Sequence, residues 1–232
     1  MDGGAITAGI PFFGTLDWDF IAENTPVFIE AAGVTLNISF WGIVFSLLLG
    51  LVCAMILELR IPVARQITLA YIEISRGTPL LIQLFLIFFG LPKLGIRWSP
   101  ELSAIIGLTF LGGSYMCEAI RAGLESVGSI QYESAQVLGM GRLQTMRFIV
   151  IPQAISTSLP GIVANVIFLI KESSVVSGIA LADLMYQAKD LIGMTYDTAE
   201  TLLLLVIAYA VILLPISIIG TILERRFDYA RR

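Results

Sequence analysis

The sequence predicts an all-α polytopic membrane protein with five transmembrane helices, on the basis of three observations. First, 57% of the 232 residues are hydrophobic and only 14% are charged, whereas a soluble domain averages about 25% charged residues. Second, apolar runs recur that approach the ~20 residues needed to cross a ~30 Å hydrocarbon core. Third, these runs are continuous rather than alternating, which favours helices over the strands of a closed barrel.

Charged or helix-breaking residues bound five apolar runs. These runs predict spans at about residues 28–57, 67–91, 101–121, 152–170 and 201–223. Glu58 and Arg60 close the first run, and Pro62 prevents the helix from continuing. Because Arg60 and Arg65 follow it, the positive-inside rule places this end in the cytoplasm and the N-terminus outside. The acidic segment 1–24 has no Lys or Arg, which fits the outer side.

The second span is apolar only in part. Its most apolar stretch, residues 79–91, would be only ~20 Å long, so the helix must also include the more polar residues before it. Gly77 and Pro79 predict a kink there. Glu73 and Arg76 stand three residues apart and can pair on one helix face.

Small residues mark the third span. Gly107, Gly112 and Gly113 are of the kind that let helices approach closely in lipid. Glu118 and Arg121 stand three residues apart near the inner end of this span, where they can pair locally.

The fourth span is predicted to begin at Pro152, a favourable first residue of a helix. The stretch after it, residues 175–193, contains Asp183, Lys189 and Asp190. These charges make it a poor crossing, so we expect a partly buried, outward-facing re-entrant segment.

The fifth span ends in a basic tail that contains Arg225, Arg226, Arg231 and Arg232. These arginines place the C-terminus in the cytoplasm. Because no linker divides the spans, residues 1–232 are expected to form a single transmembrane domain.

A polar, helix-favouring stretch separates the third and fourth spans. It contains Glu133, Ser134 and Ala135, then Gly139 after three further residues, and Ile-Val-Ile-Pro at residues 149–152 after another nine. Its charge and place predict a cytoplasmic surface helix within residues 129–147. Small residues would keep its surface thin, so that a partner's groove could approach the backbone, and Glu133 would offer a hydrogen-bond acceptor. An ordinary amphipathic surface helix is the alternative interpretation.

This loop resembles the EAA loop of ABC importer permeases, with Ser134 and Ile151 in place of the usual alanine and leucine. Other stretches are similar to the polar amino acid subfamily of binding-protein-dependent ABC importer permeases. They are AGVTLNIS at 32–39, SRGTPLLIQLF at 75–85, SYMCEAIRAGLESV at 114–127, IPQAI at 151–155 and LIKESSVVS at 169–177. The similarity covers about residues 32–226.

The resemblance implies the type I ABC importer fold and one transmembrane subunit of an ATP-driven amino acid importer in the cell membrane. It implies cytoplasmic ABC ATPase subunits, a second permease subunit in a homodimer or heterodimer, an extracytoplasmic substrate-binding protein and an amino acid substrate, but no nucleic acid. Glu133, Ser134, Ala135 and Gly139 would couple the pathway to the ATPase. Because the sequence has no G-x-x-x-x-G-K-[ST] element, MgATP is expected in the partner, and this chain is expected to hold no cofactor and to be no enzyme.

Polar residues in the spans are candidates for the substrate pathway, because a charge in the membrane costs about 2.5–3.5 kcal/mol on insertion scales. The candidates are Arg76, Tyr115, Glu118, Asn165, Lys171, Glu172, Ser173 and Ser174. Arg76 could contact a substrate carboxylate, or it could pair with Glu73 or Glu118. Asn165 could instead form an interhelical hydrogen bond. Lys171 and Glu172, beside an expected helix break, could provide the donor and acceptor that an amino acid zwitterion needs.

Other classes of protein fit less well. The absence of His argues against a Ser–His dyad, a His-based proton relay and most zinc sites. Cys53 and Cys117 stand singly in apolar runs, as small buried hydrophobic residues do. Two alternatives stay open: an ABC permease for another small solute, and an ATP-independent small channel or secondary transporter. An intramembrane protease would need a paired-Asp site, and no such pair is obvious.

Overall fold

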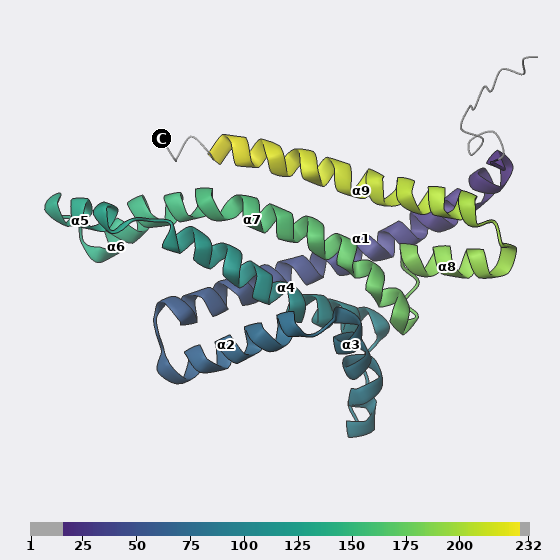
Figure 1. Cartoon of the computed structure of the whole chain (residues 1–232), viewed down its shortest axis with the longest axis horizontal. Helices are drawn as coiled ribbons and strands as arrows, with labels where there is room; N and C mark the ends of the chain where they lie inside the picture. Colours follow the sequence, from purple (N-terminus) through teal and green to yellow (C-terminus); the bar gives the residue numbers. More distant parts are fainter. Residues whose placement is uncertain (1–15, 228–232) are drawn as a thin grey trace, which may run out of the picture.

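The computed structural model describes residues 16–227, which form a bundle of helices without strands (Figure 1). The long helices are α1 (Trp18–Glu58), α2 (Pro62–Gly77), α4 (Pro100–Glu125), α7 (Ile151–Glu172) and α9 (Thr198–Phe227). The short ones are α3 (Leu80–Phe85), η1 (Leu86–Gly90), η2 (Leu91–Leu94), α5 (Ser129–Val137), α6 (Arg142–Thr145), η3 (Met146–Val150), η4 (Ser173–Ile179) and α8 (Leu184–Thr195). The all-α prediction is confirmed for this part of the chain. Residues 1–15, Arg231 and Arg232, which contributed to the predicted topology, lie outside it.

The first helix is longer than the predicted span at residues 28–57. It begins at Trp18 because Asp17 caps it: Asp17 Oδ1 accepts hydrogen bonds from the backbone N–H groups of Asp19 and Phe20, each at 3.0 Å. With 41 residues, α1 is about 60 Å long at 1.5 Å per residue. It ends where predicted, in a turn that contains Arg60 at a positive φ of 53° and leads into α2.

The second predicted span contains a sharp break. α2 and the segment that begins with α3 are bent by 106°, because Pro79 holds Thr78 in an extended conformation that ends α2. Gln83 Nε2 donates hydrogen bonds to the carbonyl oxygens of Ser75 at 2.9 Å and Thr78 at 3.0 Å, which satisfies two acceptors that the broken helix leaves free. The predicted kink is present, but it is a right-angled turn rather than a bend within one helix over residues 67–91.

The third span, α4, lies at the centre of the bundle and packs against α1, α2 and α7. Small residues allow this. A Cβ at Gly112 would lie 2.7 Å from Leu169 of α7, and one at Gly113 would lie 2.7 Å from Leu49 of α1. The predicted close approach at the small residues is therefore confirmed. The side chains that fill the centre are fully buried and include Ile38, Leu84, Leu108 and Met116.

The fourth span also starts earlier than predicted. α6, the π-helical turn η3, α7 and η4 continue as one candidate span over Arg142–Ile179. Pro152 therefore lies inside a longer helix, directly after the π-helical turn, which is a common kind of local interruption in a helix. The surface helix predicted within residues 129–147 is likewise two pieces, α5 and α6, and α6 belongs to the span.

The last part of the chain contains a short helix and a long one. α8 has 12 residues, or about 18 Å, which is too short to cross a bilayer. It packs against α1 and α9 (Figure 1), and α9 contains the predicted fifth span at residues 201–223. Among the described residues, four helices are long and apolar enough to cross a membrane, or five if the bent α2–α3 pair is one span.

Candidate functional site

A polar pocket of about 340 Å³ lies where α2 breaks into α3, next to α4 and α7. Its lining includes Arg76 from the end of α2, Tyr115 from α4, and Phe168 and Glu172 from the last turns of α7. Residues 77–80 at the break and Leu111 of α4 complete the described lining. The pocket thus presents a cation, a carboxylate and aromatic rings at one place within the bundle.

Arg76 is held from two sides. It forms an ion pair with Glu118 of α4, and its guanidinium lies 5.0 Å from the centroid of the Tyr115 ring. The side chains of Arg76 and Glu118 keep 36% and 45% of their surface exposed, so both can still reach a solute. Of the two partners that the sequence suggests for Arg76, the structure pairs it with Glu118 and not with Glu73.

The predicted local pair between Glu118 and Arg121 is wrong. Arg121 instead bonds to Glu125, one turn further along α4, with Nε and Oε1 3.0 Å apart. The i,i+4 spacing suits such a pair, and it leaves Glu118 free to face Arg76 across the α2–α4 contact.

The other predicted pathway residues lie around this pocket rather than in its lining. Asn165 Nδ2 donates a hydrogen bond to the carbonyl oxygen of Tyr115 at 3.1 Å, so it links α7 to α4. Ser173 is fully buried, and its Oγ donates to the Ile170 carbonyl oxygen at 2.7 Å. Lys171 is exposed, and neither it nor Ser174 lines the pocket.

Sequence reasoning missed one aromatic residue of this pocket. Phe168, whose ring centroid lies 5.1 Å from that of Tyr115, comes from an apolar span in which nothing distinguishes it. Gln83, a polar residue of the second apolar run and therefore a weaker candidate for the pathway, instead bonds to the backbone at the break and does not line the pocket. Gly77 and Pro79 predict that the helix is interrupted here, but they do not predict how sharply the chain bends.

The loop predicted to couple to an ATPase forms α5, at one end of the bundle (Figure 1). Glu133 and Ser134 are exposed there, as a docking contact requires. Ala135, in contrast, is fully buried, because α5 packs against the start of the fourth span at η3. The interpretation that Ala135 keeps the exposed surface thin for a partner is therefore corrected: Ala135 supports the helix from its inner side.

Gly139 ends α5 instead of lying on its surface. It has φ of 73°, and its N–H bonds to the Gln136 carbonyl oxygen while the Met140 N–H bonds to the Ala135 carbonyl oxygen, both at 3.0 Å. This is the Schellman pattern of a helix end, in which glycine adopts the left-handed conformation without steric cost. The requirement for glycine here is thus conformational, since nothing lies within 4 Å of an added Cβ.

Exposed apolar side chains around α5 were missed by sequence reasoning. Ile130, Val137, Leu138 and Leu143 are each 72–89% exposed. Such a group on a polar loop marks an interaction surface. Their only signal in the sequence is that they are apolar residues within an otherwise polar segment.

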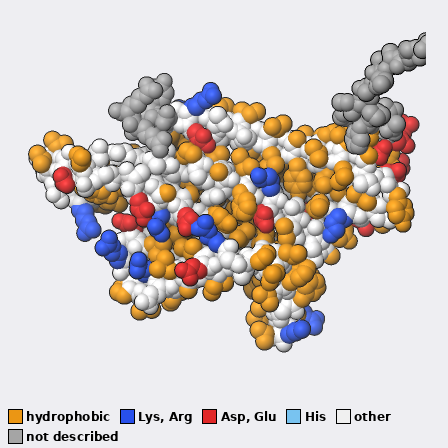
Figure 2. Space-filling model, viewed as in Figure 1, with side chains coloured by type: hydrophobic (Ala, Val, Ile, Leu, Met, Phe, Trp, Pro, Cys, Tyr) orange, Lys and Arg blue, Asp and Glu red, His pale blue; other side chains and the backbone are white. Residues whose placement is uncertain are grey.

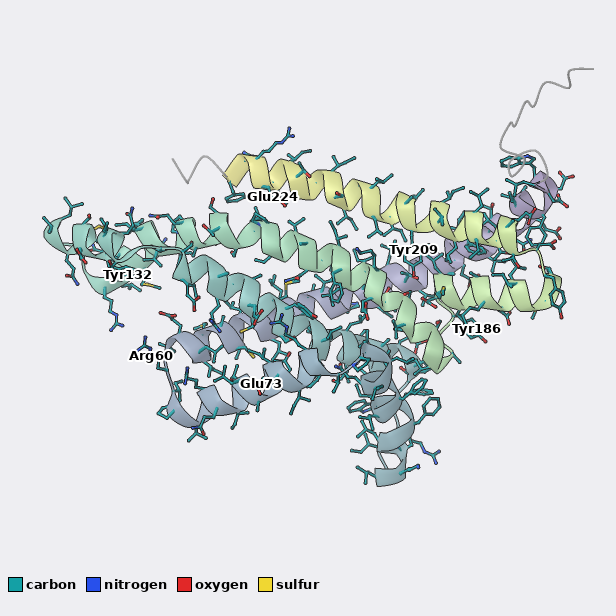
Figure 3. All side chains as sticks on the ribbon, viewed as in Figure 1. Arg60, Glu73, Tyr132, Tyr186, Tyr209 and Glu224 are labelled. Carbon is teal, nitrogen blue, oxygen red and sulfur yellow. The ribbon has the colours of Figure 1, made fainter. Side chains whose placement is uncertain are left out.

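A buried carboxyl lies in the connection between the fourth and fifth spans, outside the membrane-spanning helices. Asp183 is fully buried and caps α8, where its Oδ1 accepts the Tyr186 N–H at 2.9 Å. Its Oδ2 has no hydrogen-bond partner among the described residues. Lys189 of α8 is the described titratable side chain whose charge acts on it, and Tyr186, whose N–H it accepts, can be located in Figure 3.

Burial raises the pKa of Asp183 to about 6, against the lowering effect of its backbone hydrogen bonds. The Asp183 carboxyl group therefore binds its proton more tightly in the folded chain than in the unfolded chain, where the pKa of Asp is about 3.9. This tighter proton binding stabilises the folded chain fully below pH ~4, and the stabilisation is lost as the pH rises through ~6. We expect Asp183→Asn, which keeps the cap, to raise stability at pH 7.5 by on the order of 2–3 kcal/mol and to flatten its dependence on pH. Thermal unfolding measured in buffers between pH 4 and pH 8 checks this, because that range covers roughly the full expected change in stability.

Asp190→Asn is the matched control, because it removes an exposed carboxylate from the same helix. An unchanged pH profile in Asp183→Asn, or the same change in both variants, would contradict the assignment.

The chain is similar to known proteins over most of its length. The family model described as "Binding-protein-dependent transport system inner membrane component" matches residues 26–229. The "Probable amino-acid permease protein YxeN" of Bacillus subtilis (strain 168) is 35% identical over 91% of this chain and 96% of its own length. The "Arginine transport system permease protein ArtQ" of the same organism is 33% identical over 91% and 97%.

Solved structures agree with these relatives. A structure described as an amino acid ABC transporter with histidines superposes with a TM-score of 0.85 at 35% identity, and it covers 91% of this chain and 99% of that one. The MetNI methionine ABC transporter in an inward-facing conformation has a TM-score of 0.70 at 18% identity, over 91% and 99%, which indicates a shared fold.

Proposed function

The chain belongs to the family of binding-protein-dependent transport system inner membrane components, which are multi-pass membrane permeases, and from this premise we propose that it is the transmembrane subunit of an ATP-driven amino acid importer. The observation that carries the substrate class is that relatives and a solved structure similar over most of the chain are named for amino acid transport. ATP hydrolysis is assigned to separate cytoplasmic subunits. A second permease and an extracytoplasmic binding protein complete the proposed assembly.

The proposed topology has the N-terminus outside and the C-terminus in the cytoplasm. The end of the bundle where α1 stops and α2 starts carries Arg60 and Arg65, and α9 reaches the same end with Arg225 and Arg226 (Figure 1). The excess of arginine at that end supports its cytoplasmic position. The proposed pathway runs past the pocket at the break between α2 and α3.

The pocket at the break suits a zwitterion. Arg76 offers a guanidinium that can bind a carboxylate, and Glu172 offers a carboxylate for an ammonium group. A volume of about 340 Å³ lies within the range of small-molecule pockets.

A channel or secondary transporter is the alternative function, and it differs from an importer of this family in needing no ATP.

Purification and reconstitution test the proposal. The full chain, tagged and extracted from its native membrane, should co-purify with an ATPase, and proteoliposomes of the complex should accumulate labelled amino acid only with ATP. Accumulation that proceeds without an ATPase subunit and without ATP would identify the channel or secondary transporter instead.

The coupling role of the loop leads to a separate prediction. Gly139→Ala should lower ATP-driven uptake about three- to tenfold, because a side chain at this left-handed position costs about 1–2 kcal/mol and loosens the end of α5. Gly139→Asn should keep more activity, since asparagine tolerates this conformation. Uptake and ATP hydrolysis measured on the same complexes check this.

Gly141→Ala provides the control two residues away. Gly141 has an ordinary φ of −70°, and the nearest atom to an added Cβ lies 3.7 Å away. Equal losses in the two alanine variants would show that the helix end has no special part in coupling.

A further inference from the structure

A group of arginines at one end of the bundle has no part in the proposed transport pathway. At this end α1 stops at Glu58 and α4 stops at Glu125, and basic side chains gather there in the space-filling view (Figure 2). A pocket of about 600 Å³ lies among them. We call it the arginine pocket, and its polar lining is formed by Arg60, Arg65, Gln66, Arg121, Glu58 and Glu125.

The arginine pocket has positive charge that the described chain does not neutralise by direct pairing. Arg121 is bonded to Glu125, with Nε and Oε1 3.0 Å apart. Arg60 and Arg65 are exposed, and neither forms an ion pair with a described residue. Each of these two guanidinium groups in the lining of one pocket can bind a phosphate through paired hydrogen bonds.

Arg60 also has an unusual backbone conformation. Its φ of 53° lies in the left-handed region, which costs a non-glycine residue about 1–2 kcal/mol. The turn places Arg60 at the connection between α1 and α2, where Figure 3 labels it. A residue held in such a conformation is a candidate for a functional contact.

An apolar groove of about 450 Å³ adjoins the arginine pocket, and Glu58 lines both. The groove lies between α1, α4 and α7, with Tyr132 of α5 and Met146 of η3 also in its lining, and among the described residues Glu58 is the only charged one that lines it. Leu51, Met55 and Ile155 line it and are 45–52% exposed, so the groove is at the surface of the bundle. Its lining includes successive turns of α1, from Leu51 to Glu58, and of α7, from Ile151 to Ile162, so the groove follows the direction of these helices.

We propose that the arginine pocket and the apolar groove together bind one anionic phospholipid of the inner leaflet. Its headgroup phosphate would lie on Arg60 and Arg65, and one acyl chain would lie in the groove. The pocket is at the ends of two apolar helices, where headgroups are found, and basic pockets between spanning helices on the cytoplasmic side suit anionic headgroups. The choice of leaflet rests on the topology proposed above.

The arginine pocket lies next to the apolar groove, and this arrangement favours an anionic phospholipid over other ligands. A soluble phosphate would use the pocket and leave the groove unused, whereas a neutral lipid would fill the groove without needing two unpaired arginines. A phospholipid with a net negative headgroup matches both parts in the arrangement that a membrane imposes.

Thermal unfolding of the full chain in a neutral detergent, titrated with phosphatidylglycerol, tests this proposal. We expect phosphatidylglycerol to stabilise the chain at lower concentration than phosphatidylcholine. Arg60→Gln with Arg65→Gln should raise the half-saturating phosphatidylglycerol concentration about tenfold or more, as loss of a charge-assisted hydrogen bond predicts. Ile155→Trp, which fills the groove without changing charge, should weaken the same response.

Arg225→Gln with Arg226→Gln is the matched control, because it removes two arginines from the same end of the bundle but outside the pocket. Equal stabilisation by glycerol 3-phosphate would assign the pocket to a soluble anion and overturn the proposal. Equal effects of the two double variants, or of the two lipids, would also overturn it. Loss of the response in a complex with ATPase subunits would assign the pocket to that partner instead. Because none of these readouts is transport, their failure leaves the importer proposal standing.

Discussion

Arg76→Met is expected to lower ATP-driven amino acid uptake roughly 10- to 100-fold, the equivalent of about 1.5–3 kcal/mol for a charge-assisted hydrogen bond. The variant removes the guanidinium from the pocket and leaves Glu118 without its ion-pair partner. Initial rates of uptake into proteoliposomes, with the binding protein saturated by substrate, measure the effect.

A double variant separates the two roles that Arg76 can have. If Arg76 serves only to neutralise Glu118, then Arg76→Met with Glu118→Leu removes both charges and should restore most of the uptake, as seen when ion pairs are replaced by apolar pairs. If Arg76 binds the substrate carboxylate, the double variant should stay as impaired as Arg76→Met. Arg121→Met, which breaks the ion pair outside this pocket, should change uptake little.

Gly50→Ala is expected to destabilise the folded chain by about 1–3 kcal/mol, the usual range for overpacking. An added Cβ would lie 2.5 Å from Met116 Cβ and 2.7 Å from the Cys117 backbone nitrogen. Because part of that contact is backbone, α1 and α4 would have to move apart. Gly50→Leu should prevent the two helices from packing at all. Thermal unfolding of purified chain and the fraction recovered as a single species check these results.

Gly33→Ala on the same helix is the control. Nothing lies within 4 Å of a Cβ at Gly33, so the variant should gain about 1 kcal/mol of helix propensity or be neutral. Similar losses at positions 33 and 50 would mean that the effect comes from the helix itself and not from its contact with α4.

Much of the fold could be predicted from the sequence, because apolar run length and arginine position depend on the bilayer and little on tertiary detail. The breaker at Gly77 and Pro79 correctly located the interruption of the second span, but the 106° bend depends on what α3 packs against. The start of the fourth span was placed at Pro152 from a rule on helix ends. The helix passes through that proline, because α6 and η3 precede it without a break.

The sequence predicted which residues belong to the candidate site better than it predicted which of them form ion pairs with each other. Arg76, Tyr115, Glu118 and Glu172 were singled out as charged or polar residues in or near the spans, and the structure brings them together. Which carboxylate pairs with Arg76 depends on how α2 lies on α4, and spacing within one helix does not contain that information. Phe168 could not be distinguished from other apolar residues for the same reason.

The length of α1 has a consequence for the membrane in which the chain can reside. The uncharged part of this helix, residues 31–57, is about 40 Å long at 1.5 Å per residue, whereas the hydrocarbon layer is ~30 Å thick. Such hydrophobic mismatch is relieved by tilting the helix or thickening the lipid around it. A tilt near 40° would match the two lengths, since roughly 30 Å of 40 Å is then projected on the membrane normal. A thicker bilayer would therefore be met by an α1 that stands more upright, and bilayer thickness would be transmitted to the angle between α1 and the helices it packs against.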